Sequence, residues 1–381
     1  MIEATGRLND WTTERENMYK HTITLETKPD FEKSAERMEA FWNRAILDRP
    51  FIQVVAPNPN WTKPYPVKQH ASIRERWLDI DHKVDCAIAN VESTWYGGDS
   101  IPIFMPNLGP EIMTTAYGAA MEFSETTSWT EPCLTDLGRL DALKFDPENF
   151  YIRHLMKMIE AGLERGRGKF LTGLTDIHPG GDLAASLRNP QDFCMDLVDS
   201  PELCERLLAK IQPDFAMFYD MQYDLLKKHG QWVTSSWIPF FTEGRFYIPS
   251  NDFSCMVSPE MFDRFFLGRL AEECAFLDRS IYHLDGPGAL CHLPSLLSIK
   301  DLDAIQWVSG AGNGPDTKWM KVFQEIQAAG KAMQIWSSFE ELDVYMENLR
   351  PEGVALCTWV RSVEEGEAYI RKASTWTKKG A

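Results

Sequence analysis

Several features that would place this sequence of 381 residues in a familiar class are missing from it. The eight cysteines include no C-x-x-C pair, which suits reduced thiols rather than a disulfide scaffold. Basic residues are scarce, with 39 Lys and Arg against 56 Asp and Glu, and the net charge of −17 disfavours nucleic acid and anionic membrane surfaces. No apolar run approaches the roughly 20 residues of a membrane span, and residues 1–20 lack the core of a signal peptide. We therefore expect a cytoplasmic protein that binds neither nucleic acid nor membranes.

Common catalytic and nucleotide-binding motifs are also missing. The chain has no G-x-x-x-x-G-K-[ST], no G-x-S-x-G, no H-E-x-x-H and no EF-hand loop. Residues 309–314 contain three alternating glycines, but their G-x-G-x-G spacing is not that of a dinucleotide-binding loop. These absences leave the function to be inferred from the arrangement of strands and polar residues.

What the sequence does contain is a regular alternation of short β-rich segments with longer amphipathic stretches, the pattern of βα units. The expected strands cover residues 51–56, 101–105, 170–176, 232–240, 280–285, 304–308, 332–336 and 353–359. Eight strands in this alternation predict an α/β fold, specifically a TIM (β/α)8 barrel. We expect one barrel domain over residues 41–381, preceded by an N-terminal arm over 1–40. The segment 94–147, rich in Gly, Pro and Thr, is expected to be an insertion over the barrel mouth.

In such a barrel, the active site forms at the carboxyl ends of the strands. Asp176 and His178 close one expected strand and are candidates for substrate binding. Trp237 and Trp307 lie in two others and would line an aromatic pocket if they face inward. Two alternatives stay open, because Asp176 could simply cap a turn and the tryptophans could be core residues.

A sharper candidate is the pair His283 and Asp285, which lie two residues apart in one expected strand and therefore on one face. Cys357 closes the last expected strand. An imidazole, a carboxylate and a thiolate together carry a charge of about −2, which would neutralise Zn²⁺ and leave an open coordination position. The alternative is that Asp285 begins a turn, His283 is a hydrogen-bonded core residue and Cys357 a small buried one.

Four segments carry a resemblance to a known family. They are residues 182–188 (DLAASLR), 251–262 (NDFSCMVSPEMF), 283–286 (HLDG) and 357–368. These segments resemble the uroporphyrinogen decarboxylase superfamily, which also contains the corrinoid-linked methyltransferases, over roughly residues 41–372. The resemblance implies a (β/α)8 barrel.

The resemblance favours the methyltransferase branch. True decarboxylases hold their acidic tetrapyrrole with arginines of an R-x-P-V-W-x-x-R-Q-A-G-R motif, of which the segment beginning Arg49-Pro50-Phe51 keeps only the first arginine. A protein of charge −17 is a poor host for a polyanionic porphyrinogen. Asp99 nevertheless resembles the pocket aspartate of the decarboxylases. The methyltransferases hold zinc with an H-x-C pair and a distant cysteine, so one thiolate would be replaced here by the carboxylate of Asp285.

Our leading hypothesis is a zinc-dependent, corrinoid-linked methyltransferase that moves a methyl group between a small donor and a corrinoid or thiol acceptor. Zinc would be held by His283, Asp285 and Cys357, and the corrinoid would be free cobalamin or part of a corrinoid protein. The second hypothesis is a metal-free decarboxylase or lyase acting on a small carboxylate, with Asp99 or Asp252 stabilising a protonated intermediate. The third is a non-enzymatic barrel that binds a tetrapyrrole or a corrinoid protein. The resemblance also implies pairing into a homodimer, although no residues mark such a face.

Overall fold

The computed structural model describes residues 20–21 and 23–377 as a mixed α/β protein. The strands are β1 Phe51–Pro57, β2 Thr94–Gly98, β3 Ile103–Phe104, β4 Met121–Phe123, β5 Ser128–Thr130, β6 Leu171–Thr172, β7 Val233–Ser235, β8 Phe241–Glu243, β9 Phe246–Tyr247, β10 Arg279–Asp285, β11 Ala304–Val308, β12 Ala332–Trp336 and β13 Val354–Trp359. All eight segments expected to be strands contain one, which confirms the α/β alternation.

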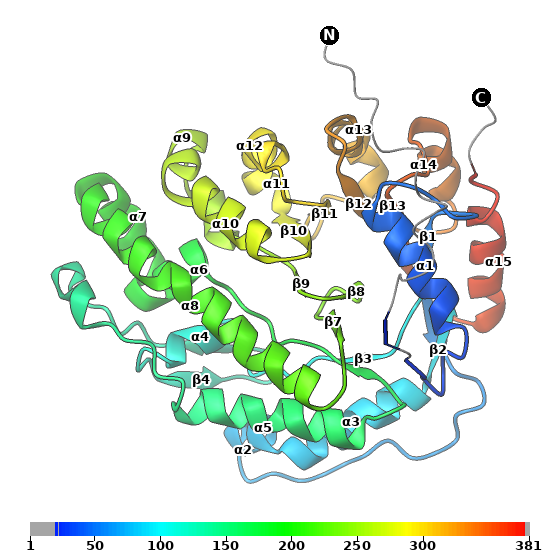
Figure 1. The fold of residues 1–381 in the computed structure, drawn as a ribbon, viewed down its shortest axis with the longest axis horizontal. Helices are drawn as coiled ribbons and strands as arrows, with labels where there is room; N and C mark the ends of the chain where they lie inside the picture. The colour runs from blue at the N-terminus through cyan, green and yellow to red at the C-terminus, as the bar shows by residue number, and fades with distance from the viewer. Residues whose placement is uncertain (1–19, 22, 378–381) are drawn as a thin grey trace.

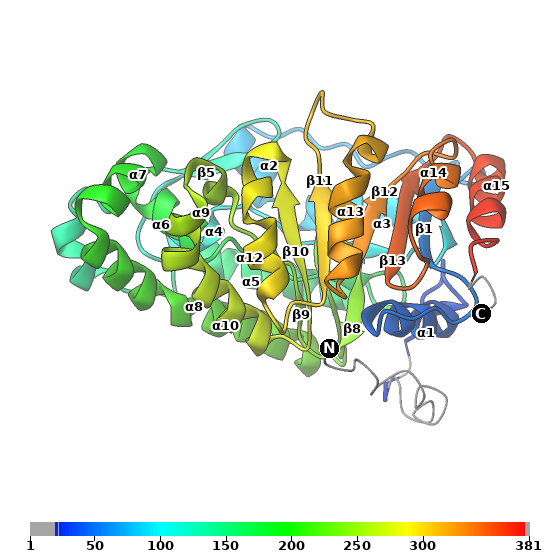
Figure 2. The ribbon, with the colours of Figure 1, turned by 90° about the horizontal axis from the view of Figure 1, so that it is seen from above.

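The helices surround the strands in Figure 1, and α12, α13 and α14 cover one side of the large sheet in Figure 2. The α-helices are α1 Phe31–Trp42, α2 Ile73–Leu78, α3 Ile80–Glu92, α4 Ile112–Thr115, α5 Phe150–Arg165, α6 Gly180–Arg188, α7 Pro190–Asp199, α8 Pro201–Lys228, α9 Pro259–Phe262, α10 Gly268–Phe276, α11 Gly286–Ala289, α12 Leu293–Ser298, α13 Met320–Ala328, α14 Leu342–Asn348 and α15 Val363–Ala373. Short 3-10 turns η2 Leu137–Ala142, η3 Asp252–Met256, η5 Leu290–His292 and η6 Asp316–Trp319, and a π-helical turn η4 Asp263–Leu267, link some of them. None of the helices in this described part of the chain has the length and hydropathy needed to cross a membrane.

The largest sheet has seven strands in the order β2-β1-β13-β12-β11-β10-β9, and all its neighbours are parallel except β2 beside β1. Strands β3 and β6 form a separate parallel pair. Contacts link β6 to β7 and β7 to β9, so the strands follow the order expected of a barrel. In the described residues, however, no ladder joins β2 to β3, β6 to β7 or β7 to β9, so the hydrogen bonding does not close into a ring. The fold is therefore a seven-stranded, mostly parallel sheet beside short two-stranded sheets, and one of the open seams lies between β2 and β3.

Alternation along the strands divides the buried residues into two cores. One core is enclosed by the strands and includes Phe51, Ile281, Ala304 and Ala355. The other, which includes Ile305, lies between the sheet and the helices. Central parallel strands are apolar on both faces for this reason. A polar residue on the inner face of such a strand is therefore an exception that needs an explanation.

Two parts of the chain differ from their expected roles. Residues 31–40 of the expected N-terminal arm belong to α1, whose Phe41 and Trp42 pack into the strand-enclosed core. Helix α1 lies at the end of the sheet opposite to the strand tips in Figure 2 and covers it there. Residues 1–19 of the arm lie outside the described residues. The segment 94–147 supplies β2 to the seven-stranded sheet and β3 to the pair with β6, and only its remainder, with α4, β4 and β5, lies apart from these strands.

Candidate active site

Five polar side chains form a hydrogen-bonded row across adjacent strands. They are His283 of β10, Gln306 of β11, Gln334 of β12, Cys357 of β13 and Gln53 of β1. The His283 Nδ1 is 2.6 Å from Gln306 Oε1, and Gln306 Nε2 donates to Gln334 Oε1 at 2.5 Å. Gln334 Nε2 donates to Cys357 Sγ at 3.2 Å, and this thiol donates to Gln53 Oε1 at 3.4 Å. Every member of the row except His283 is buried, and each forms a hydrogen bond with the next member.

The row follows from a pattern that the sequence analysis missed. Each of three apolar strands carries a single glutamine at its third position, in FIQVV, AIQWV and AMQIW. Because side chains alternate along a strand, Gln53, Gln306 and Gln334 lie on the same face as the alanines and phenylalanine of the enclosed core. A lone amide in an otherwise apolar buried strand is the signal by which they could have been found.

A cavity of about 430 Å³ lies beside this row at the carboxyl ends of β1, β12 and β13. Gln53 and Cys357 line its polar part, while Trp237, Trp336 and Tyr96 give it aromatic walls. Burial raises the pKa of the Cys357 thiol to about 12, although the hydrogen bond from Gln334 opposes the shift. The thiol is therefore protonated at neutral pH, which agrees with its role as a donor to Gln53.

A second cluster gathers at the start of α6. A Cβ atom on Gly181 would lie 2.5 Å from Oδ1 of the buried Asn251 side chain, so a larger residue there would require this amide to shift. The next residue, Asp182, accepts the backbone N–H groups of Asp252 at 3.0 Å and of Phe253 at 2.8 Å with its carboxylate. Asp182 thereby holds η3 against α6 and places Asp252 at the site.

His178 lies between two carboxylates in this cluster. Its Nε2 is 3.2 Å from Asp176 and its Nδ1 is 3.3 Å from Asp182. Burial alone would lower the pKa of His178, but the hydrogen bonds and charges of Asp176 and Asp182 outweigh it, and the pKa is raised well above its ordinary value. The imidazole is therefore protonated at neutral pH. Burial, and then the charge of Asp182, raise the pKa of Asp252.

The two groups of residues belong to one mouth. His178, Asp182 and Asp252 line a smaller hollow of about 250 Å³. His283 contacts Trp237 of the larger cavity edge to face at 5.0 Å between ring centroids, and it is among the neighbours that influence the pKa of Asp252 in the smaller hollow. The structure thus brings four of the residues singled out from the sequence, Asp176, His178, Asp252 and His283, to one end of the sheet.

The expected zinc ligands are not gathered in this arrangement. His283, Asp285 and Cys357 do not form a group with ligand atoms within 4.8 Å of one another, whereas His178, Asp182 and Asp252 do. The side chains of Gln306 and Gln334 stand between His283 and Cys357, and Asp285 is exposed at the end of its strand. The three predicted ligands therefore do not fit a zinc ion as they stand, and no step of the chemistry below depends on one.

Two other predicted site residues lie away from both hollows. Asp99 is fully buried and is held by Arg49 at 2.6 Å and by Arg37 at 3.0 Å. Trp307 is 1% exposed, belongs to the core between sheet and helices, and packs on Trp319 with 5.1 Å between the ring centroids. The alternation along β11 places Gln306 inward, and it therefore places its neighbour Trp307 outward. These positions favour structural roles for both residues.

Comparison with known proteins gives a fold but no family. No family model matches the chain, and no curated protein matches it in sequence. Among solved structures, it is similar to that of a methyltransferase from Methanosarcina mazei, with 12% sequence identity and a TM-score of 0.59. The similarity covers 89% of this chain and 97% of the other. It therefore extends over most of the fold.

Proposed function

We propose that this protein is a methyltransferase of the corrinoid-linked type, which takes a methyl group from a small donor bound at the carboxyl ends of the strands. The observation that carries the proposal is the fold similarity to a methyltransferase over 89% of this chain. The mouth offers room for a small donor whose heteroatom lies in the 250 Å³ hollow, beside His178 and Asp252, and whose apolar part faces the tryptophan walls of the 430 Å³ cavity. A corrinoid, free or carried by a partner protein, would supply the nucleophile that accepts the methyl group.

The residues of this chain would provide the proton for the leaving group. When a methyl group bound to oxygen or nitrogen is transferred, the bond between carbon and heteroatom breaks and the heteroatom must gain a proton. His178 would supply this proton by way of Asp176 or Asp182, because each of its two ring nitrogens pairs with one of these carboxylates. Asp252 lines the same hollow, and its raised pKa favours a proton there as well.

The direct test is a methyl-transfer assay with reduced cobalamin and separate donors: methanol, methylamines and a methoxyarene. Formation of methylcobalamin is followed by its absorption spectrum. We expect turnover with at least one donor, and a loss of about 10²–10⁴-fold in rate for His178→Gln. His229→Gln is the matched control, because His229 also pairs with a carboxylate, that of Glu160 at 3.3 Å, but lies at the end of α8 away from both hollows. Turnover that is unaffected by His178→Gln would contradict the role of His178.

The zinc prediction is tested in the same preparation by metal analysis of protein purified without a histidine tag. Stoichiometric zinc that is lost in Cys357→Ser would show that the row of hydrogen bonds rearranges to bind it. Zinc-free protein with full activity would remove zinc from the hypothesis and leave the methyltransferase proposal intact.

A second candidate, a metal-free decarboxylase of small carboxylates, is favoured by one observation. The raised pKa of Asp252 makes this carboxyl a proton source beside the protonated His178. Release of CO₂ from a small carboxylate, abolished by Asp252→Asn, together with no methyl transfer from any donor, would replace the methyltransferase proposal with this one.

A further inference from the structure

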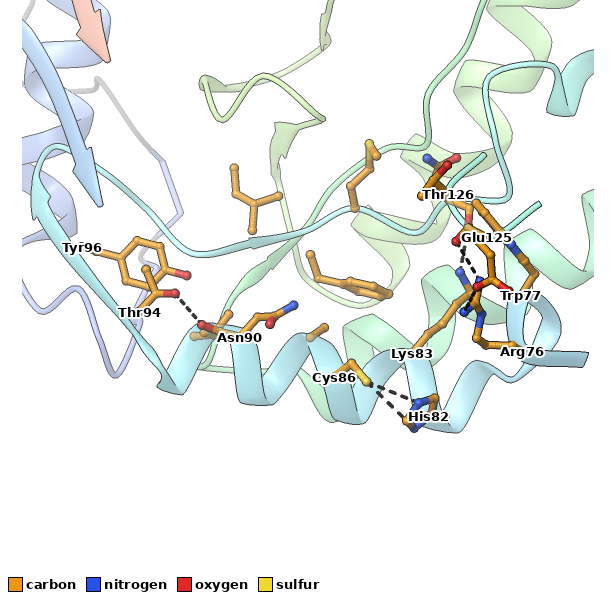
Figure 3. Close-up of a pocket in the computed structure, with 16 residues that line it drawn as sticks. Arg76, Trp77, His82, Lys83, Cys86, Asn90, Thr94, Tyr96, Glu125 and Thr126 are labelled. Carbon is orange, nitrogen blue, oxygen red and sulfur yellow. Dashed lines mark hydrogen bonds and ion pairs between the residues drawn. The ribbon is translucent and has the colours of Figure 1, made fainter. Parts of the chain in front are cut away.

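A third cavity, of about 620 Å³, lies outside the strands, between α3 and the segment that contains β3 (Figure 3). Arg76, Trp77 and Lys83 lie near one end of it, and Tyr96 lies near the other. Cys86, on the next turn of α3, lies between them. Of these residues, only Tyr96 also lines the 430 Å³ cavity described above, and the other four take no part in the chemistry proposed there.

Lys83 is in an unusual environment for a lysine. Its Nζ lies 4.5 Å from the centre of the Trp77 ring and 3.4 Å from the carbonyl oxygen of Asn107. Within residues 20–21 and 23–377, it forms no ion pair with a carboxylate. Burial, and then the charge of Arg76, lower the pKa of Lys83 to about 8, so the group is charged at neutral pH but poorly solvated. Partial burial of a cation that has no anionic partner costs free energy, and an anionic ligand that pairs with the cation would offset this cost.

The charge of the cavity lining is opposite to that of the chain. The protein as a whole carries a net charge of −17, yet the lining contains Arg76 and Lys83 against one acid, Glu125. Glu125 is paired with Arg76, at 2.7 Å. Lys83 is therefore the cation that is left to attract a mobile anion.

We propose that this cavity is a binding site for a small organic anion, with Lys83 holding the acidic group and the aromatic lining of Trp77, Phe104 and Tyr96 contacting the apolar part. An ammonium beside an aromatic wall recognises an acid through a charge-assisted hydrogen bond and an apolar body through ring contacts. Carboxylates and phosphate esters share this chemistry.

The site is distinct from the candidate active site but adjoins it. Tyr96, Ile103 and Met105 line both this cavity and the 430 Å³ cavity. These residues lie at the seam between β2 and β3, where no ladder of the described strands closes the wall. The anion site does not depend on the proposed methyl transfer, because it is tested by binding alone.

The test compares two probes of nearly equal shape that differ in charge. Binding of 4-fluorobenzoate and of 4-fluorobenzamide to the full chain is measured at pH 7 by fluorine NMR, and phenyl phosphate is then added as a competitor. We expect the benzoate to bind at least about tenfold more tightly than the amide, as one charge-assisted hydrogen bond implies. Displacement by phenyl phosphate would show that the site accepts both classes of acid, and failure to displace would restrict it to carboxylates.

Two variants locate the binding. Lys83→Met should weaken benzoate binding about tenfold or more and leave amide binding unchanged, while Lys83→Arg should keep the preference for the anion. Lys321→Met, at an exposed lysine of α13, is the matched control and should bind both probes as the wild type does. The proposal is wrong if the wild type binds the amide and the benzoate with equal affinity. This outcome is measured on the wild-type protein alone and does not depend on the folding of a variant. It is equally wrong if folded Lys83→Met keeps the wild-type affinity for benzoate.

Discussion

The role of Asp99 can be decided by a single substitution, because the structure and the decarboxylase hypothesis assign it different tasks. Its Oδ2 accepts Arg49 Nη1 at 2.6 Å and the backbone N–H of Ile52 at 3.0 Å. Its Oδ1 accepts Arg49 Nη2 at 3.1 Å and Arg37 Nη1 at 3.0 Å. The carboxylate is fully buried, and the side chain of Arg49 is only 8% exposed. The hydrogen bonds of Asp99 therefore join the start of β1 to the turn after β2.

The magnitude follows from what Asp99→Asn leaves behind. Arg37 keeps its second carboxylate partner, Asp48, at 2.7 Å. Arg49 has no second carboxylate among the described residues and becomes a buried, unpaired cation. Removing one partner of a buried ion pair costs about 3–5 kcal/mol. Asparagine keeps one oxygen as an acceptor, so we expect a loss of about 3 kcal/mol in the free energy of unfolding.

The assay is urea unfolding followed by circular dichroism, with Asp48→Asn as the control. The Asp48 side chain is 49% exposed, and its loss should cost less than about 1 kcal/mol. Asp99→Asn combined with Arg49→Met should recover part of the lost stability, because the unpaired cation is then removed. The reasoning is refuted if Asp99→Asn unfolds at the same urea concentration as the wild type. If this variant keeps the wild-type stability but loses activity, Asp99 acts in the chemistry rather than in the stability of the fold.

Two further predictions follow from buried ionisable groups. Burial raises the pKa of Glu273 from 4.5 to about 8. The Glu273 carboxyl therefore binds its proton more tightly in the folded state than in the unfolded state, and the free energy of unfolding falls as the pH rises from about 5 to 8. The free energy of unfolding of Glu273→Gln, measured by urea unfolding, should therefore rise relative to that of the wild type by up to about 1.4 kcal/mol per pH unit over that range. A difference between variant and wild type that stays constant with pH would contradict this prediction. The Cys357 thiol, with a pKa of about 12, should resist iodoacetamide at pH 8 while the exposed Cys291 reacts, as followed by mass spectrometry; equal rates in the folded protein would show that the thiol is not enclosed.

Local signals in the sequence predicted the positions of the long strands well. Strands β11 and β12 cover the expected residues 304–308 and 332–336, because short apolar runs bounded by turns are strongly biased to be buried strands. Where 170–176 was expected, the ladder covers only Leu171–Thr172. The chain leaves the ladder after Thr172 and leads into the segment that carries Asp176 and His178. The small strands β4 and β5 were not predicted, because three residues give too short a pattern.

The sequence by itself determined where the longer strands of the large sheet lie and which of their residues share a face, because both depend on local alternation. It could not determine how far apart residues of different strands would lie. Strands β10 and β13 are three spacings apart, about 14 Å along the sheet, and Gln306 and Gln334 fill the interval between His283 and Cys357. The tertiary structure alone brought His178 and Asp252 together, because their meeting depends on the contact between α6 and η3 that the hydrogen bonds of Asp182 make. Distances between segments remote in sequence are set by packing and by the curvature of the sheet, which no local pattern encodes.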